Sequence, residues 1–479
     1  MFWTLENFRT VLAGTWMAKP ATPSPVAIEG VSVDSRTIKP GEVFFALKGD
    51  VHDGHRYIEA AAQAGASVII LQDSTALPSD FPRRFPSVAA LRVGDARRAL
   101  GQLALAYRRS LDSVRVIAVT GSNGKTTTVR LIDAVLRAKF RGRASIKSYN
   151  NDIGVPLTIF SARPGDQYLV CEVGMNAPGE IAPLARIVEP DVAVITSIGR
   201  AHIETFDDQL GIVREKASLL SFVRPHGLAV VTADCPDLDP YLKPVPNVVM
   251  FGRSDRADLR LTASEHAGDP PSRVRFTINE RVTHEIPLLG EHNALNAMAA
   301  VAVGRRLGLE EEDIGRGLAG AVPAEMRLRH DRVGGLDLFN DAYNSSPESA
   351  MAAIRTFADL ARGATRRVVV LGDMLELGSH SEKAHEELGE CLVECFGPAG
   401  PELECLIGVG RYAPHVAETV ARLCPRTEVH AFEGMDDARA NEVCTLLGAG
   451  DAVLLKGSRG VGLDRIATAL RNSGTPVGS

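Results

Sequence analysis

Residues 116–128 are the stretch best suited to chemistry, and they read Val-Ile-Ala-Val-Thr-Gly-Ser-Asn-Gly-Lys-Thr-Thr-Thr. An apolar, β-branched run ends in a glycine-bearing turn, and a helical pattern begins just after Lys125. That order puts backbone N–H groups and a helix N-terminus where a polyphosphate can bind. The sequence therefore predicts an ATP site in which Lys125 reaches the β- and γ-phosphates and the Thr126 hydroxyl holds Mg2+. The residues expected around the phosphates are Gly121, Ser122, Asn123, Gly124, Lys125, Thr126 and Thr127.

This loop departs from the generic phosphate-binding pattern at one position. The generic pattern has a glycine where Val119 stands, so the match is to the shorter form Thr-Gly-x-x-Gly-Lys-Thr. The alternative is a glycine turn followed by a chance Lys-Thr pair. The order of strand, loop and helix favours the phosphate loop.

Further polar groups follow apolar strands, and ligands collect beyond the carboxyl ends of strands in open α/β sheets. Glu172 ends the apolar run 168–172, and its carboxylate is either a hard oxygen ligand for Mg2+ or a solvated strand-end acid. His202 lies in the polar loop after the apolar run 191–198 and is either a ligand or a structural histidine. Lys216 falls in a helical pattern, where a surface lysine is the ordinary expectation.

Asn293 and Asn296 are three residues apart at a helix start. This spacing places both amides on one face of the helix, where they are suited to reading a nucleobase. Helix capping by Asn293 is the alternative, and the two roles are compatible.

The first and last parts of the chain contain polar clusters of their own. Residues 340–349 suggest either polar contacts aimed across a cleft or a loop with a helix cap. Residues 456–460, Lys-Gly-Ser-Arg-Gly, end a strand and predict a small basic anion-binding nest. Near the start, Ser35, Arg36 and nearby glycine N–H groups suit a diphosphate. We find no Ser-His-Asp order and no Cys-His nucleophile, which argues against a covalent acyl-enzyme.

The elements that must position these residues alternate between strand and helix in three blocks. These blocks are residues 1–112, 113–322 and 323–479, and the second opens at the phosphate loop and includes a predicted β-hairpin over 273–287. Strands alternating with helices predict parallel sheets covered on both faces. We therefore expect an α/β fold of three domains.

Composition bounds the class of protein. Of the 479 residues, 45% are hydrophobic and 23% are charged, as in an ordinary globular chain. A formal charge of -6 disfavours a dedicated nucleic-acid binder. The seven cysteines are scattered without a C-x-x-C pair, which is typical of reduced thiols in a cytoplasmic protein. We expect no signal peptide and no membrane span, because no apolar run approaches about 18 residues.

Taken in order, these motifs resemble those of the Mur ligases, ATP-dependent enzymes that extend the peptide of the peptidoglycan precursor. The resemblance covers essentially the whole chain. The segments that carry it are residues 34–36, 53–55, 120–128, 150–156, 172–180, 198–204, 341–347, 372–378 and 456–459. Residues 372–378, Gly-Asp-Met-Leu-Glu-Leu-Gly, favour the members that add D-alanyl-D-alanine. The Asp-Asn-Pro-Arg motif usual in the members that add the third residue does not occur.

The resemblance implies a small UDP-binding N-terminal α/β domain, a central P-loop-type parallel-sheet ATPase domain and a Rossmann-like C-terminal domain. The implied catalytic residues are Lys125, His202 and Lys216, and the implied Mg2+ ligands are Thr126, Glu172 and His202. Asn293 and Asn296 would face adenine, while Arg327, Asp341 and Tyr343 would contact the nucleotide from the C-terminal domain. The implied substrate-binding residues are Ser35, Arg36, Asp53, Gly54, His55, Asn151 and Asn344. In some relatives the lysine matching Lys216 is carbamylated and supports a second Mg2+.

The implied reaction joins D-alanyl-D-alanine to UDP-N-acetylmuramoyl-tripeptide through an acyl phosphate, in a monomeric cytoplasmic enzyme that uses ATP and Mg2+. Two segments depart from the family pattern. Asn344-Ser345-Ser346-Pro347 replaces the usual Asn-Ala-Asn-Pro, and Gly460-Val461-Gly462-Leu463 replaces a Met-rich continuation. Both departures leave the contacts to the incoming amino substrate open.

Two alternative functions stay open. The nearer one is another Mur-type ligase, either the tripeptide-forming enzyme or a folate polyglutamylating relative. The more distant one is a P-loop switch or motor without ligase activity. Such proteins usually show an acidic pair ending an apolar strand or an Asn-Lys-x-Asp motif, and neither occurs in this sequence.

Overall fold

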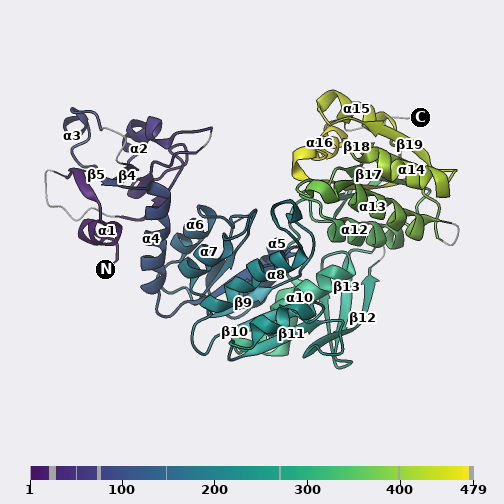
Figure 1. Ribbon diagram of the computed structural model, residues 1–479, viewed down its shortest axis with the longest axis horizontal. Coiled ribbons are helices and arrows are strands. Elements are labelled where there is room, and N and C mark those ends of the chain that lie inside the picture. Colours follow the sequence, from purple (N-terminus) through teal and green to yellow (C-terminus); the bar gives the residue numbers. More distant parts are fainter. Residues whose placement is uncertain are drawn as a thin grey trace.

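The computed structural model describes residues 2–20, 28–49, 51–72, 77–146, 148–268, 271–397 and 400–473. The end of the third expected block, residues 474–479, lies outside this range. The described residues form three sheets, and each sheet is built from one of the three expected blocks (Figure 1). The N-terminal and C-terminal domains lie at opposite ends of the long axis, with the central domain between them.

The N-terminal sheet has five strands in the order β1-β5-β4-β3-β2. Its strands are β1 (Thr15–Ala18), β2 (Gly30–Ser32), β3 (Glu42–Phe45), β4 (Val68–Gln72) and β5 (Ala89–Val93). Its helices are α1 (Leu5–Leu12), α2 (Ile58–Gln63) and α3 (Phe81–Arg84), with the 3-10 turn η1 (Gly54–Tyr57). All neighbours pair in parallel except β1, which closes one edge antiparallel to β5.

The central sheet has nine strands in the order β14-β13-β12-β11-β10-β9-β6-β8-β7. Its strands are β6 (Arg115–Thr120), β7 (Gly142–Ala144), β8 (Tyr168–Glu172), β9 (Val192–Ile195), β10 (Leu228–Thr232), β11 (Val248–Gly252), β12 (Leu259–Ala267), β13 (Arg273–Ile278) and β14 (Val282–Ile286). Its helices are α4 (Ala96–Arg109), α5 (Lys125–Arg137), α6 (Gly154–Ser161), α7 (Ile181–Val188), α8 (Gln209–Ala217), α9 (Asp239–Leu242), α10 (Glu291–Arg306) and α11 (Glu311–Ala319), with three 3-10 turns, η2 (Ile203–Thr205), η3 (Ser218–Phe222) and η4 (Pro236–Leu238). Strand β6 lies between β8 and β9, so the chain turns to opposite sides of β6, and ligands bind at such switch points.

The C-terminal sheet has six strands in the order β15-β16-β20-β17-β18-β19, and only β15 runs antiparallel to its neighbour. Its strands are β15 (Arg329–Val333), β16 (Leu336–Asp341), β17 (Arg366–Gly372), β18 (Cys405–Val409), β19 (Glu428–Phe432) and β20 (Asp451–Lys456). Its helices are α12 (Pro347–Leu360), α13 (Ser381–Phe396), α14 (Ala413–Leu423), α15 (Asp437–Thr445) and α16 (Asp464–Ser473), with the 3-10 turns η5 (Gly378–His380) and η6 (Arg459–Val461).

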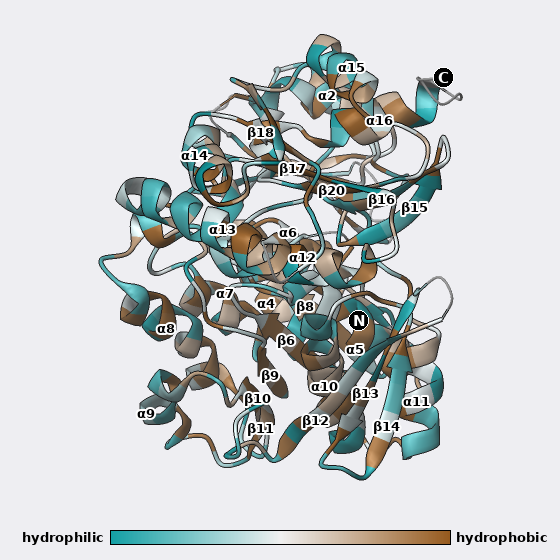
Figure 2. Ribbon diagram, turned by 90° about the vertical axis from the view of Figure 1, so that its right-hand side faces the viewer, coloured by the Kyte–Doolittle hydropathy of each residue, from teal (hydrophilic) through white to brown (hydrophobic). Residues whose placement is uncertain are grey.

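The central strands of the two larger sheets are buried on both faces. Every residue of β8, β10 and β20 is buried, which explains why these strands read as nearly continuous apolar runs rather than alternating ones. Figure 2 shows hydrophobic strands inside the central and C-terminal domains and more hydrophilic residues on peripheral helices such as α11. Helix α5 packs against α10 and α11 and turns Val129, Ile132 and Val135 into this core.

The expected parallel α/β architecture is confirmed, with antiparallel strands added at the sheet edges. The predicted hairpin is also confirmed as β13 and β14, joined through Asn279 and Glu280, which both have positive φ. All seven cysteines are free thiols. Among the described residues, no helix combines the length and the apolar composition that crossing a membrane requires.

Candidate active site at the junction of the central and C-terminal domains

The phosphate loop occupies the turn between the end of β6 and the start of α5. Gly121 has φ 152° and Gly124 has φ 80°, so both adopt backbone conformations that favour glycine. A Cβ at Gly121 would overlap Oγ1 of Thr196, and a Cβ at Gly124 would overlap Oδ1 of Asn296. Gly124 is the N-cap of α5 and supplies no side-chain cap, which leaves the first N–H groups of the helix available to an anion.

Lys125 folds back over this loop. Its Nζ donates to the carbonyl oxygens of Gly121, at 2.8 Å, and of Ser122, at 3.3 Å. Burial lowers the pKa of Lys125, and the guanidinium of Arg327 lowers it further, while the Glu172 carboxylate opposes both effects. The ammonium is therefore poorly neutralised in this structure and would gain from an anionic ligand.

Thr126 and Glu172 form the centre of a candidate metal site. Oγ1 of Thr126 donates to Oε2 of Glu172 at 2.8 Å, and Nδ2 of Asn150 donates to Oε1 of the same carboxylate at 2.8 Å. Glu172 is 1% exposed, and no cationic side chain of the described residues forms an ion pair with it. A buried carboxylate beside a hydroxyl is a hard-oxygen donor set that fits Mg2+, which would balance the charge.

His202 lies in the loop after β9, next to η2. Its Nδ1 is 2.7 Å from Oε2 of Glu376, which belongs to the C-terminal domain. His202 lines the same cavity as Thr126 and Glu172. The expected grouping of these three residues is therefore present, and Glu376 joins it from the other domain.

This cavity has a volume of about 290 Å³ and lies between the central and C-terminal domains. The side chains expected at the site that line it are Ser122, Asn123, Gly124, Lys125, Thr126, Asn151, Glu172, His202, Arg327, Tyr343 and Asn344. Tyr343 ties the two walls together, because its hydroxyl donates to Oγ of Ser148 at 2.8 Å. Arg327 stacks over the Tyr343 ring, 4.1 Å from its centroid.

A second cavity of about 210 Å³ adjoins the first and shares the phosphate loop with it. Asn293 and Asn296 of α10 line it together with Thr127 and Asp341. Nδ2 of Asn296 donates to Oδ1 of Asn293 at 3.0 Å, so the two amides share one face as expected. The capping alternative for Asn293 is wrong, because α10 begins after Gly290 and Asn293 donates instead to the carbonyl of Leu289.

Lys456 does not form the open basic nest that its motif predicted. Its Nζ lies 2.7 Å from Oδ2 of Asp341 and donates to the carbonyl of Asn344 at 2.8 Å. It is 2% exposed, so its charge is already matched inside the protein. Strands β16 and β20 place Asp341 directly opposite Lys456, which fixes Asp341 at the cavity wall.

Lys216 is buried rather than on the surface, with 1% exposure in α8, so the ordinary expectation for this lysine is wrong. No described residue forms a hydrogen bond or an ion pair with its ammonium. Burial holds the pKa of Lys216 well below its usual value, and the nearby Lys125 lowers it further. A neutral amine is the form that this environment favours.

The expected substrate residues of the N-terminal domain form a separate cluster. Arg36 pairs with Asp34 at 2.7 Å just beyond β2, and its side chain is 86% exposed. His55 pairs with Asp53 at 2.7 Å beyond β3, on the same edge of the sheet. Ser35, Arg36, Asp53, Gly54 and His55 are absent from the described lining of both cavities. The structure thus leaves them apart from the phosphate loop, whereas Asn151 and Asn344 reach it.

Several site residues were missed in the sequence. Asn150, rather than its neighbour Asn151, binds Glu172, and both belong to the same 150–156 motif. Ser148 and His292 line the cavities without a recognisable spacing signal. Glu376 lies in the 372–378 motif, so that motif was the available signal for it.

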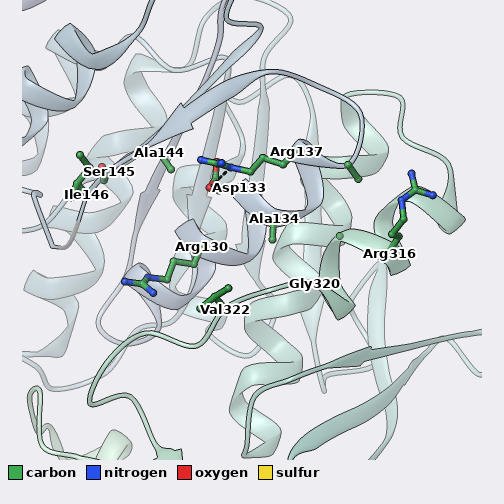
Figure 3. A pocket seen from close by; sticks show the side chains of 12 residues that line it. Arg130, Asp133, Ala134, Arg137, Ala144, Ser145, Ile146, Arg316, Gly320 and Val322 are labelled. Carbon is green, nitrogen blue, oxygen red and sulfur yellow. Dashed lines mark hydrogen bonds and ion pairs between the residues drawn. The ribbon is translucent and has the colours of Figure 1, made fainter.

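A third cavity of about 620 Å³ lies away from this junction (Figure 3). Helices α5 and α11 and the segment before β15 surround it, and Arg130, Arg137 and Arg316 project around it. Arg137 pairs with Asp133 at 2.8 Å, and Arg130 donates to the carbonyl of Pro323 at 3.2 Å. Arg316 pairs with Asp313, so all three arginines are engaged within the protein. None of the described lining residues belongs to the two cavities above.

Three family models match the chain and together span most of it. They are the Mur ligase family, catalytic domain over residues 27–108, the Mur ligase middle domain over residues 119–304, and the Mur ligase, glutamate ligase domain over residues 326–459.

Curated relatives match over nearly their whole length. A UDP-N-acetylmuramoyl-tripeptide–D-alanyl-D-alanine ligase from Bacillus subtilis (strain 168) is 35% identical over 473 residues, which is 98% of each chain. The enzyme of that name from Escherichia coli (strain K12) is 30% identical over 487 residues, covering 98% of this chain and 99% of the other.

Solved structures of MurF share both the fold and a significant part of the sequence of this chain. A crystal structure of MurF from Acinetobacter baumannii is 30% identical with a TM-score of 0.83, covering 98% of this chain and 99% of that one. MurF ligase from Thermotoga maritima in complex with ADP is 26% identical with a TM-score of 0.77, covering 94% and 98%. The phosphate loop, the buried oxygen donors and these full-length matches agree, and the chain belongs to the Mur ligase family, within its MurF branch.

Proposed function

We propose that this protein joins D-alanyl-D-alanine to UDP-N-acetylmuramoyl-tripeptide at the expense of ATP, in the synthesis of the peptidoglycan precursor. Relatives named for this activity match 98% of the chain. The observation that carries the proposal is the cavity between the central and C-terminal domains. There Lys125, Thr126 and Glu172 face Arg327 and Tyr343 across a space open to both domains.

ATP is the nucleotide that this cavity suits. Its phosphates would lie on the N–H groups of the phosphate loop, with Lys125 beside the β- and γ-phosphates. Its adenine would enter the adjoining cavity against Asn293 and Asn296. The ADP complex of the Thermotoga maritima relative supports a nucleotide in this fold. Arg327 and Asp341 would contact the nucleotide from the C-terminal domain.

Thr126, Glu172 and His202 would hold Mg2+. The donor set supports this, since a buried carboxylate and a hydroxyl are already in contact. Bound there, Mg2+ would supply positive charge that lets two anions, the substrate carboxylate and the triphosphate, approach each other.

The reaction then needs two displacements. A carboxylate oxygen of the tripeptide attacks the γ-phosphorus, the bond to the bridging oxygen breaks, and ADP leaves with that electron pair. The amine nitrogen of D-alanyl-D-alanine attacks the acyl carbon of the resulting acyl phosphate. The tetrahedral species collapses to the amide and expels phosphate, and the nitrogen loses its proton. Lys125 stabilises charge on the phosphoryl oxygens, and contacts between the domains exclude water that would hydrolyse the acyl phosphate.

Lys216 would act as a carbamate. The nitrogen of its neutral amine would bond to the carbon of carbon dioxide and release one proton to solvent. The resulting carbamate anion would place a negative charge beside the buried Lys125. Such an anion could support a second Mg2+.

The N-terminal domain would hold the UDP end of the substrate. Ser35, Arg36, Asp53, Gly54 and His55 would form this site, in which the Ser35 hydroxyl and the Arg36 guanidinium suit a diphosphate. The N–H groups of Gly54 and His55 are bonded to Leu47 and Asp53 in this structure. Because they lie away from the phosphate loop, the tripeptide must extend from one domain to the other, with Asn151 and Asn344 near its reacting end.

Mass spectrometry of the product tests the proposal. Purified protein is incubated with ATP, Mg2+, UDP-N-acetylmuramoyl-tripeptide and D-alanyl-D-alanine. The product should have the summed mass of the tripeptide substrate and D-alanyl-D-alanine less one water. Omitting ATP should abolish it. If folded protein leaves both the tripeptide substrate and D-alanyl-D-alanine unchanged, the proposal is contradicted.

A further inference from the structure

Glu376 reaches from the C-terminal domain into the central domain. It lies in the loop after β17, and its Oε2 is 2.7 Å from Nδ1 of His202. Both residues have φ 64°, a left-handed backbone conformation that residues other than glycine rarely adopt. Two uncommon backbone conformations, one in each domain, therefore meet at one contact, and such strain persists where the surroundings enforce it.

The loop that carries Glu376 is held in place on its own domain. The N–H of Met374 donates to Nε2 of His385 at 3.1 Å, and the N–H of Leu375 donates to Oγ of Ser458 at 2.9 Å. The N–H of Ser458 donates back to the carbonyl of Asp373 at 3.1 Å. The Glu376 carboxylate is therefore presented by a fixed backbone.

The loop that carries His202 is held by the same domain at further points. The N–H of Glu204 donates to the carbonyl of Glu376 at 3.2 Å. Arg200 pairs with Glu348 at 3.0 Å and with Glu387 at 2.7 Å. The contact between His202 and Glu376 thus forms only when the C-terminal domain is docked on the central one.

We infer that Glu376 is a positioning residue, which fixes His202 in the tautomer that can bind the metal; this inference rests on the proposed function. Oε2 of Glu376 lies 2.7 Å from Nδ1 of His202, so a proton held on Nδ1 would face this carboxylate and the Nε2 lone pair would be left for the cavity that His202 lines with Thr126 and Glu172. Carboxylates orient metal-binding histidines in this way in many proteins, and losing such a partner costs about 10- to 100-fold in metal affinity.

The competing explanation is an ordinary ion pair that only holds the domains together. Glu387 provides the matched control, because its carboxylate lies at the same interface but pairs with Arg200 rather than His202. An ion pair that acts only in docking predicts equal effects of losing either carboxylate. A positioning role predicts an effect on metal binding for Glu376 alone.

The test uses full-length protein with a non-hydrolysable ATP analogue and Mn2+ as the probe, with free Mn2+ followed by electron paramagnetic resonance. Glu376→Ala should raise the Kd for Mn2+ about 10-fold or more. Glu376→Gln keeps an acceptor oxygen and should recover most of that loss, while Glu387→Ala should bind Mn2+ as the unchanged protein does. Wild-type Kd in Glu376→Ala, or equal losses in Glu376→Ala and Glu387→Ala, would overturn the inference.

A second measurement does not depend on the folding of the Glu376 variants. Nitrogen-15 NMR of histidine-labelled unmodified protein, with the His202 signal assigned through His202→Gln, should show the proton on Nδ1. A proton on Nε2 would overturn the inference. Neither readout requires ligase turnover, so protein that fails to make the ligated product but shows these shifts contradicts only the proposed function.

Discussion

Oγ1 of Thr126 lies 2.8 Å from Oε2 of Glu172, and the two oxygens come from different elements that β6 and β8 bring together. Thr126 sits in the first turn of α5, and Glu172 is the last residue of β8. A cation entering between them would replace one hydrogen bond by two metal–oxygen contacts. Metal binding at this pair would thus be joined directly to the phosphate loop.

The main effect of replacing Thr126 should be on the Mg2+ concentration that the enzyme requires. In Thr126→Ala the hydroxyl is lost, and the Mg2+ concentration for half-maximal rate should rise about 10-fold or more, by analogy with the loss of other metal-site partners. Thr126→Ser keeps the hydroxyl and is the matched control, with a near-normal Mg2+ requirement. Rates measured across a Mg2+ titration decide this, and identical titrations for the Ala and Ser variants would exclude Thr126 as a ligand.

Lys125→Ala should lower kcat about 100- to 1,000-fold, the usual cost of removing one preorganised donor to developing charge. The variant should keep its melting temperature, because the two described hydrogen bonds of Lys125 Nζ both go to loop carbonyls. Lys139→Ala is the control, since Lys139 lies beyond the other end of α5 and binds the carbonyl of Gly308. Phosphate release near the normal rate in folded Lys125→Ala protein would refute its role.

Lys216 should carry a carbamate at neutral pH. Since burial lowers its pKa, the reactive neutral amine persists there and is lost only as the pH falls below that lowered pKa. Carbon-13 bicarbonate should therefore give an NMR signal in the unmodified protein that Lys216→Ala lacks. Formate or a similar small anion should restore part of the activity lost in Lys216→Ala. A fully active Lys216→Ala protein without any added anion would reject the carbamate.

Replacing Arg36 should weaken binding of the UDP-linked substrate and leave binding of ATP unchanged. Losing its charge-assisted hydrogen bonds should raise the KM for that substrate about 10-fold in Arg36→Ala and leave the KM for ATP unchanged. Arg9→Ala, which removes another exposed arginine paired with an acid, is the control. Arg36 lowers the pKa of Asp34 to about 2, so the carboxylate stays ionised until the pH falls toward that value, and the KM effect should not vary between about pH 5 and 8. An unchanged KM in steady-state kinetics would remove Arg36 from the substrate site.

The sequence allowed prediction of features that local physics determines. The phosphate loop, Glu172 and the strands around them follow from apolar runs that end in polar turns, and the structure has them at those positions. The paired amides of Asn293 and Asn296 follow from helical spacing. The domain boundaries and the roles of the site residues remain predictions.

Contacts between distant segments could not be predicted in the same way. Burial of Lys216 depends on packing around α8, which the sequence of that helix does not reveal. Pairing of Lys456 with Asp341 depends on β20 lying beside β16, although 115 positions separate the two residues. The contact between Glu376 and His202 depends on how two domains dock, which no local pattern encodes.

The most direct test of the proposed ligase reaction is the rate of ADP release with UDP-N-acetylmuramoyl-tripeptide and a panel of amino substrates. D-alanyl-D-alanine should support turnover, whereas diaminopimelate, lysine and glutamate should leave the rate at that seen without any amino substrate. Release of ADP with one of those three and not with D-alanyl-D-alanine would assign the chain to another ligase of the family. No ADP release with any of them would contradict the proposed reaction itself.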